Sequence, residues 1–154
     1  MAEKGRNETV IRNRKAKFEY QLEEVFTAGM VLKGTEVKSL RQGKASLQEA
    51  YCFVEKDEVF IRKMTINEYD KGSYNNHEPG RVRKLLLHKK EIKKIRKGLD
   101  QKGYALIPVK VYFNDRNFAK MDIALGKGKK MADKRETMKE RDTKREMDRQ
   151  MKGY

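Results

Sequence analysis

The sequence predicts a small, mainly β protein with short helices, an α+β chain whose strands form a barrel. Three observations lead to this class. About five to seven short runs are extended or alternate apolar and polar side chains, as half-buried strands do. One stretch near residue 95 repeats apolar residues at helical spacing. The chain contains only 2 prolines, so few positions interrupt pairing between strands. These features together are typical of a small barrel.

The N-terminal residues 1–13 are polar, and we expect a flexible segment there. The first strand is predicted to start at Phe18, because Phe18, Tyr20 and Leu22 alternate with charged or polar neighbours. Gly29 permits a bend, after which an extended apolar run resumes. This part of the chain therefore opens the barrel.

Residues 33–44 lie between glycine punctuation at Gly34 and Gly43. Val37 and Leu40 are three positions apart, which favours one side of a helix. The pattern predicts one or two helical turns.

A hairpin is predicted over residues 50–66, with its turn at 56–58. The single cysteine, Cys52, lies in its apolar first half, and we expect a buried, small, hydrophobic side chain. The stretch 67–80 is polar, contains Pro79 and reads as a loop.

The most basic element, residues 81–88, precedes a predicted helix over 89–101. The apolar residues of this helix share one face: Ile92, Ile95 and Leu99. Gly103 stands where a helix C-cap would lie. We therefore expect an amphipathic helix with lysines on its outer side.

Two strands complete the domain, over residues 104–113 and 118–125, joined by a turn at 114–117. Pro108 cannot donate a backbone hydrogen bond, so the first of these strands is expected at an edge or with a bulge. An open barrel of the oligonucleotide-binding (OB) type fits this set of elements over residues 14–125. The strand order is not fixed by the pattern.

The formal net charge of +15 is concentrated in three segments. Residues 1–17 carry six basic and two acidic side chains, residues 81–97 carry nine and one, and residues 126–154 carry eleven and six. Such clusters attract phosphates and release counterions, so a nucleic acid is the leading partner. An anionic membrane surface would match the charge too. The sequence shows neither a spanning run nor a signal peptide, so we expect a cytoplasmic protein without membrane contact.

Catalysis is poorly supported. The two histidines, His77 and His88, have no metal-ligand spacing with each other or with carboxylates. The glycine-rich run 126–130 lacks the spacing of a phosphate loop. We therefore expect no enzyme, no cofactor and no metal, although a nuclease using His88 and Glu36 stands as a competing hypothesis.

RNA binding has better support. If residues 81–84 are extended, Arg81 and Arg83 point to one side together, which suits two neighbouring phosphates. His88 precedes the helix and can cap it or contact a phosphate. Recognition should rest on phosphate and shape, as with folded RNA. We expect the aromatic residues in the core instead of stacked on bases: Tyr20, Tyr51, Phe53, Phe60, Tyr104, Phe113 and Phe118.

The C-terminal residues 126–154 contain no Val, Ile, Leu, Phe or Trp. Such a segment cannot pay for ordering by apolar burial, so we expect a basic tail, disordered when free, that becomes helical on a polyanion. Its glycines at 126 and 128 would let backbone and lysines approach a phosphate. The helical pattern rests on the pairs Glu140 with Lys144 and Asp148 with Lys152. A tail that only improves solubility is the alternative.

Four runs, in this order along the chain, resemble small protein B, a bacterial family of tmRNA-binding (SsrA-binding) proteins. They are Asn13-Arg14-Lys15-Ala16, Gly34-Thr35-Glu36-Val37-Lys38-Ser39-Leu40-Arg41, Arg83-Lys84-Leu85-Leu86-Leu87-His88-Lys89, and Gly126-Lys127-Gly128-Lys129-Lys130 with Asp133-Lys134-Arg135. The resemblance covers about residues 11–154 and implies an OB-type barrel.

The resemblance also implies a non-enzymatic role in trans-translation. The barrel would bind the tRNA-like domain of tmRNA and, with elongation factor Tu, deliver it to stalled ribosomes. The tail would enter the empty messenger channel near the small-subunit decoding region and become helical. We expect a monomer. The alternative is a general single-strand or ribosomal RNA-binding OB protein without tmRNA specificity.

Carried over residue by residue, the resemblance implies tmRNA contacts at Asn13, Glu36, Lys38, Arg83, Lys84, Leu86 and Lys120. To these, the basic element adds Arg81 and His88. Ribosome contacts are implied for the tail residues Gly126, Lys127, Gly128, Lys129, Lys130, Asp133, Lys134 and Arg135. Glu36 has a structural alternative, a helix cap or an internal salt bridge. Thr27 and Ala132 depart from the family pattern, so no role is carried over to them.

Overall fold

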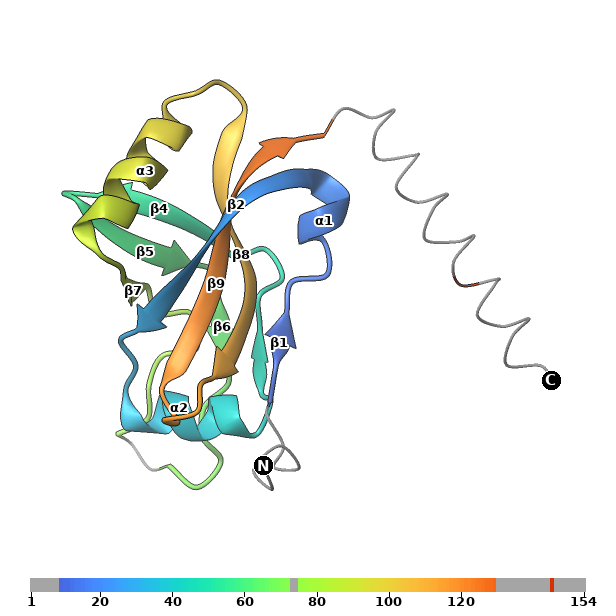
Figure 1. The fold of residues 1–154 in the computed structure, drawn as a ribbon. Coiled ribbons are helices and arrows are strands. Elements are labelled where there is room, and N and C mark those ends of the chain that lie inside the picture. The colour runs from blue at the N-terminus through green and yellow to red at the C-terminus, as the bar shows by residue number, and fades with distance from the viewer. Residues whose placement is uncertain (1–8, 73–74, 130–144, 146–154) are drawn as a thin grey trace.

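Six strands form a closed ring in the computed structural model, which describes residues 9–72, 75–129 and 145 (Figure 1). The strands are β2 (Tyr20–Met30), β4 (Tyr51–Glu55), β5 (Glu58–Arg62), β7 (Arg83–Leu86), β8 (Tyr104–Phe113) and β9 (Ala119–Gly128). They pair in the order β8-β4-β5-β7-β2-β9, and a further pairing of β8 with β9 closes the ring. The predicted OB-type barrel is therefore confirmed.

The other elements decorate this ring. The helices are α1 (Ala16–Glu19), α2 (Gly34–Arg41) and α3 (Lys89–Leu99), and the short strands are β1 (Ile11–Arg12), β3 (Ala45–Ser46) and β6 (Thr65–Ile66). In Figure 1, α2 crosses the lower end of the barrel, whereas α1 and α3 lie at the upper end. Strand β1 pairs with β8, and β3 pairs with β6 in a separate two-stranded sheet.

The core is built by alternation along the strands. Inward residues such as Ala28, Ile61 and Met121 are fully buried, and Ile95 of α3 belongs to the same core cluster with no exposed surface. The close approach of α3 depends on Gly98, because an added Cβ there would lie 2.5 Å from Leu125 Cδ1. The apolar face of this amphipathic helix therefore packs against the barrel.

Several predicted elements are confirmed. The helix between Gly34 and Gly43 is α2, and the hairpin is β4 with β5. Lys56 and Asp57 form its turn with positive φ values of 49° and 61°. Pro108 lies at a register shift between β8 and β9, so the bulge, of the two predicted alternatives, is the one present.

The N-terminal third differs from the prediction. Phe18 belongs to α1, whose turn closes when the backbone N–H of Glu19 donates to the carbonyl of Lys15. Strand β2 then begins at Tyr20 and runs through Gly29 without ending there. Three alternating residues are too few to separate a helical turn from a strand. Residues 1–13 are not all outside the fold either, because Ile11 pairs with Val111.

The C-terminal ends of the last helix and of the last strand differ from the prediction. Helix α3 ends at Leu99 with Asp100 as its C-cap, so Gly103 lies beyond it, with φ +85°, in the turn before β8. Strand β9 continues to Gly128, and Gly126 pairs with both Leu22 and Ala105. An added Cβ at Gly126 would lie 2.9 Å from Ile107 Cδ1. This glycine therefore serves strand packing, and the barrel extends past residue 125.

The expectation that the aromatic residues form the core is wrong. Tyr51 is 41% exposed and Phe118 is 62% exposed, and the other five lie partly exposed at the surface. Among the described residues, Phe26 is the only aromatic side chain in the buried cluster, and Phe113 is partly buried and packs against it. The barrel interior is filled by aliphatic and methionine side chains, because a small ring of strands has little room for large aromatic rings.

Candidate nucleic-acid interface

Strand β7 sorts its side chains by strict alternation. Arg83 and Leu85 point inward and are 0% and 1% exposed, whereas Leu86 is 51% exposed on the outer face. Lys84 shares that outer face and forms an ion pair of 3.0 Å with Glu58. As predicted, Arg81 and Arg83 point to one side together, since both guanidinium groups contact Glu36. That side faces the interior at Arg83, so the two arginines do not form a pair of phosphate-binding groups.

A contiguous surface crosses three strands at Gly29. Leu86 of β7 pairs with Gly29 of β2, and Gly29 pairs with Lys120 of β9. Directly paired residues of antiparallel strands point to the same side of the sheet. The Cβ position of Gly29 is 3.5 Å from Leu86 Cβ and 3.7 Å from Lys120 Nζ. We call Lys84, Leu86, Gly29 and Lys120 the outer patch. It combines the apolar side chain of Leu86 with two lysines, and Gly29 contributes only backbone.

A carboxylate organises the next stretch of this face. Asp122 Oδ1 accepts hydrogen bonds from Thr27 Oγ1 at 3.0 Å and from the Tyr112 hydroxyl at 3.2 Å. Lys110 Nζ lies 3.8 Å from Asp122 Oδ2. Partial burial and the neighbouring Asp122 carboxylate raise the pKa of the Tyr112 phenol, against the effect of Thr27. Thr27 is therefore part of a fixed polar cluster beside the outer patch.

Glu36 is buried at the opposite side of this sheet. Its Oε2 lies 2.6 Å from Arg83 Nε, and its Oε1 accepts from Arg81 Nη2 at 2.6 Å. The backbone N–H of Lys33 also donates to Oε1, at 2.7 Å, which caps α2. The structural alternative for Glu36, a cap with an internal salt bridge, is what the structure contains.

Arg83 is fully satisfied inside the protein. Its guanidinium also donates to the carbonyl oxygens of Met64 at 2.8 Å, Arg81 at 2.9 Å and Pro79 at 3.0 Å. Direct contact of Glu36 or Arg83 with RNA does not fit these contacts, because neither side chain has exposed surface. A nuclease that uses Glu36 as a base does not fit them either.

The electrostatics of this pair favour the ionised carboxylate. Burial by itself would raise the pKa of Glu36, but hydrogen bonds from Arg81 and the Lys33 backbone, with the charge of Arg83, lower it below its ordinary value. Burial lowers the pKa of the Arg83 guanidinium, an effect that Glu36 opposes. The ion pair therefore holds α2 against β7.

Helix α2 is tied to the long loop by His77. His77 is 2% exposed. Its Nδ1 lies 2.8 Å from Thr35 Oγ1, and its Nε2 lies 2.8 Å from the carbonyl oxygen of Ile66. Lys38, on the exposed side of the same helix, lies over the Tyr69 ring, with its Nζ 5.4 Å from the centroid. The predicted contact residue Lys38 is thus at the surface, on the helix that also carries Glu36.

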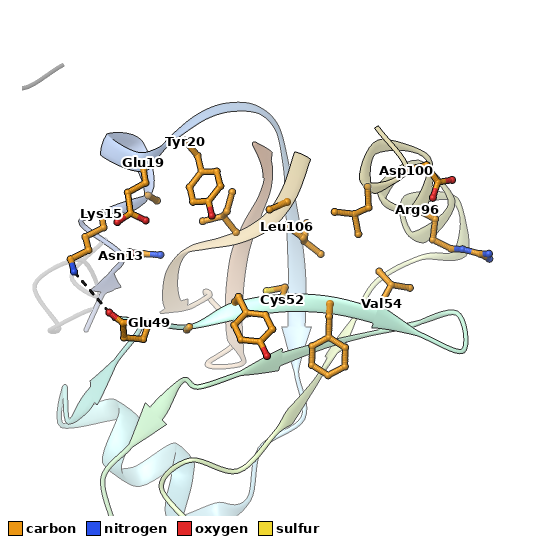
Figure 2. Close-up of a pocket in the computed structure, with 17 residues that line it drawn as sticks. Asn13, Lys15, Glu19, Tyr20, Glu49, Cys52, Val54, Arg96, Asp100 and Leu106 are labelled. Carbon is orange, nitrogen blue, oxygen red and sulfur yellow. Dashed lines mark ion pairs between the residues drawn. The ribbon is translucent and has the colours of Figure 1, made fainter. Parts of the chain in front are cut away.

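Asn13 lies in a different part of the molecule. Its side chain donates to the carbonyl oxygen of Pro108 at 2.8 Å. It stands at one end of a groove of about 730 Å³, and Arg96 stands at the other (Figure 2). The buried thiol of Cys52 lies in the wall, and burial raises its pKa. Asn13 is held by the β8 backbone, in a groove that Tyr51 and Phe53 also line.

His88 precedes α3 as its N-cap. Its backbone N–H donates to Glu91 Oε1 at 3.0 Å, and the residue is exposed. Lys129 continues from β9, and its backbone N–H donates to the carbonyl oxygen of Glu19 at 2.9 Å. The predicted tail residues Lys130, Asp133, Lys134 and Arg135 lie outside the described residues, as does the expected tail helix except for Arg145, which is helical and exposed.

The pairing of the strands adds three residues to the outer face. The sequence alone did not predict them as candidate site residues, because it does not give the strand order. Gly29, Tyr112 and Asp122 join the outer face through their partners on neighbouring strands. Alternation along 118–125 puts Asp122 on the same side as Lys120, and this is the sequence signal for Asp122. Among the described residues, no group of three or more His, Cys, Asp or Glu side chains could hold a metal ion. No helix in this part of the chain is long and apolar enough to cross a membrane.

Known proteins match this chain along almost its whole length. The family model described as "SmpB protein" matches residues 10–153. The SsrA-binding protein of Parabacteroides distasonis is 48% identical over 152 residues, which cover 99% of each chain. The SsrA-binding protein of Agrobacterium fabrum is 50% identical over 157 residues, covering 99% of this chain and 98% of the relative.

A solved structure has the same fold. A chain in the structure described as "tmRNA-SmpB: a journey to the center of the bacterial ribosome" superposes with a TM-score of 0.68 at 45% sequence identity. The match covers 80% of this chain and 86% of that chain. Because the family model and the relatives both span nearly all residues, the chain belongs to the SmpB protein family.

Proposed function

We propose that this protein binds the tRNA-like domain of tmRNA and carries it to stalled ribosomes for trans-translation, without catalysing a reaction. The observation that carries the proposal is the near-complete match to proteins named SsrA-binding, at 48% to 50% identity. The solved neighbour, described as tmRNA-SmpB on the bacterial ribosome, supports the same role.

The outer patch is the part of the barrel that suits RNA best. Lys84 and Lys120 supply two ammonium groups for phosphates, and Leu86 supplies an apolar surface between them. Gly29 has no side chain of its own, so a ribose or base would meet the backbone between the flanking side chains of Leu86 and Lys120. Lys38, Arg81, His88 and Asn13 would extend the contact around the barrel.

Glu36 and Arg83 act in this proposal as positioning residues. Arg83 lies between Lys84 and the loop that ends at Gly80, and Glu36 anchors α2, which carries Lys38. The ion pair fixes two elements that present RNA-binding side chains, and it touches no RNA itself. This replaces the direct contacts implied for both residues by the resemblance.

The tail performs the second half of the proposed task. Residues 130–154 would enter the vacant messenger channel beside the decoding region of the small subunit, where their basic side chains meet rRNA phosphates. Ordering on the ribosome would make this segment helical. We further propose that the protein works as a cytoplasmic monomer and enters the ribosome in a complex with tmRNA and elongation factor Tu.

A competition experiment tests the proposal against the alternative of a general RNA-binding OB protein. Labelled tRNA-like domain is bound at a stated physiological salt concentration and challenged with excess bulk tRNA, and separately with unstructured RNA of equal length. The proposal expects binding to survive both competitors. Equal competition by all three RNAs would instead leave a general polyanion-binding surface.

A further inference from the structure

Three aromatic rings and an arginine lie together on the outer face of the β4–β5 hairpin. Phe53 and Phe60 are directly paired across the two strands and stack, with ring centroids 5.5 Å apart and planes 24° apart. Tyr51 lies beside Phe53 at 6.3 Å, tilted by 47°. The Arg62 guanidinium lies over the Phe53 ring, 5.3 Å from its centroid. We call Tyr51, Phe53 and Phe60 the aromatic platform.

The platform is not part of the core. Cys52, Val59 and Ile61 alternate with these rings, point inward and belong to the buried cluster. None of the three rings is a member of that cluster, and Tyr51 is 41% exposed. Their aromatic surface is therefore held at the solvent, preorganised by stacking and by the arginine.

The platform is continuous with the outer patch. Phe60 pairs with Lys84 in the register between β5 and β7, so their side chains stand on the same face of the sheet. Following that face, the aromatic rings of β4 and β5 lead to Lys84 and then to Leu86. This inference therefore rests on the proposed function of the outer patch.

Charge is distributed unevenly along the hairpin. The turn carries Glu55, Asp57 and Glu58, and two of these carboxylates already pair with basic side chains, Asp57 with Arg96 and Glu58 with Lys84. Arg62 lies at the other end, directly opposite Tyr51. A nucleotide on this face is therefore expected with its base on the Tyr51 ring and its phosphate toward the Arg62 guanidinium.

We propose that the aromatic platform is a stacking site for an unpaired nucleotide of the bound RNA, with Arg62 holding the phosphate of that nucleotide. Aromatic rings are sequence-tolerant partners because every base has a π face. Unpaired bases in loops and bulges are the RNA groups that can be splayed out onto such rings. The site adds a base contact to a surface that otherwise recognises phosphate and shape.

The test uses the full-length protein with two probes, the tRNA-like domain of tmRNA and a ten-nucleotide oligouridine. Tyr51→Leu is expected to weaken binding of both by about fivefold or more, without changing the salt slope, because stacking releases few counterions. Tyr51→Trp should keep wild-type affinity. Arg62→Gln should lower the salt slope by roughly one unit.

Phe118→Leu is the matched control, since Phe118 is 62% exposed but lies beyond the hairpin, before β9. It should leave affinity unchanged. A fluorescent 2-aminopurine placed at unpaired positions of the tRNA-like domain should be quenched by wild-type protein at one position and not by Tyr51→Leu.

Unchanged affinity and quenching in a folded Tyr51→Leu protein would overturn the inference and leave the platform as a protein-contact surface or a hairpin clamp. That failure is distinct from failure of the proposed function. If bulk tRNA displaces the tRNA-like domain while Tyr51→Leu still weakens oligouridine binding, the stacking role of the platform is supported. The proposed selectivity for tmRNA is then contradicted.

Discussion

Glu36 Oε2 and Arg83 Nε lie 2.6 Å apart, and neither side chain has any exposed surface. The two residues come from α2 and β7, 47 positions apart in the chain. A charge pair inside a barrel is tolerated only when its remaining donors and acceptors are satisfied. Arg81, the Lys33 backbone and the loop carbonyls complete that network.

Removing one partner of this pair should destabilise the fold strongly. Glu36→Gln leaves a buried guanidinium without its counter-charge, so we expect a loss of about 3–5 kcal/mol in the free energy of unfolding. Urea unfolding followed by circular dichroism measures it. Glu58→Gln is the control, because the Glu58–Lys84 pair is partly exposed and should cost at most about 1 kcal/mol. Equal losses in the two variants would show that the buried pair has no special role.

Stability should fall in acid through the same carboxyl. The folded pKa of Glu36 lies below its ordinary value of 4.5, so the carboxylate contributes stability that is fully present above that value. The contribution is lost as pH falls through the folded pKa. Urea unfolding from pH 7 to pH 3 should therefore show a decline below about pH 4.5 that is smaller in Glu36→Gln. If Glu36→Gln keeps the wild-type pH dependence, the decline in stability comes from other carboxyl groups.

Lys84 and Lys120 should contribute to RNA affinity through charge. Alanine at either position is expected to weaken binding of the tRNA-like domain and to lower the salt slope by roughly one unit, because one phosphate contact is lost. The slope is read from binding titrations at several salt concentrations. Lys102→Ala removes one exposed positive charge outside the outer patch and should leave the slope unchanged. Identical salt slopes in all variants would show that the phosphate contacts are not on this face.

Local pattern predicted much of this fold and less of its surface. Apolar, β-prone runs bounded by turn residues located the β4–β5 hairpin and β8, and Pro108 indicated an edge or a bulge, because these features depend on neighbouring residues. Arg83 was misplaced because its burial depends on Glu36, a partner on a distant element. The exposed Tyr51 and Phe118 were misplaced because composition does not tell which face of a strand closes the barrel.

Strand pairing also explains why the boundary of the tail was missed. Gly126 and Gly128 have no side chains that alternate, so the pattern of β9 ends at Leu125 although its hydrogen bonding continues. The pairing of Lys127 with both Gln21 and Tyr104 keeps this end of the strand in the ring.

Two truncations should separate barrel from tail. A chain ending at Lys129 keeps all of β9 and the contact to Glu19, so it should bind the tRNA-like domain with nearly wild-type affinity while peptide tagging on stalled ribosomes stops. A chain ending at Leu125 loses strand pairs to β2 and β8, so its free energy of unfolding should fall as well. Binding titrations, tagging in a reconstituted translation system and urea unfolding measure the three effects. Loss of RNA binding in the stable, longer truncation would contradict this division of labour, because it would place tmRNA contacts in the tail itself.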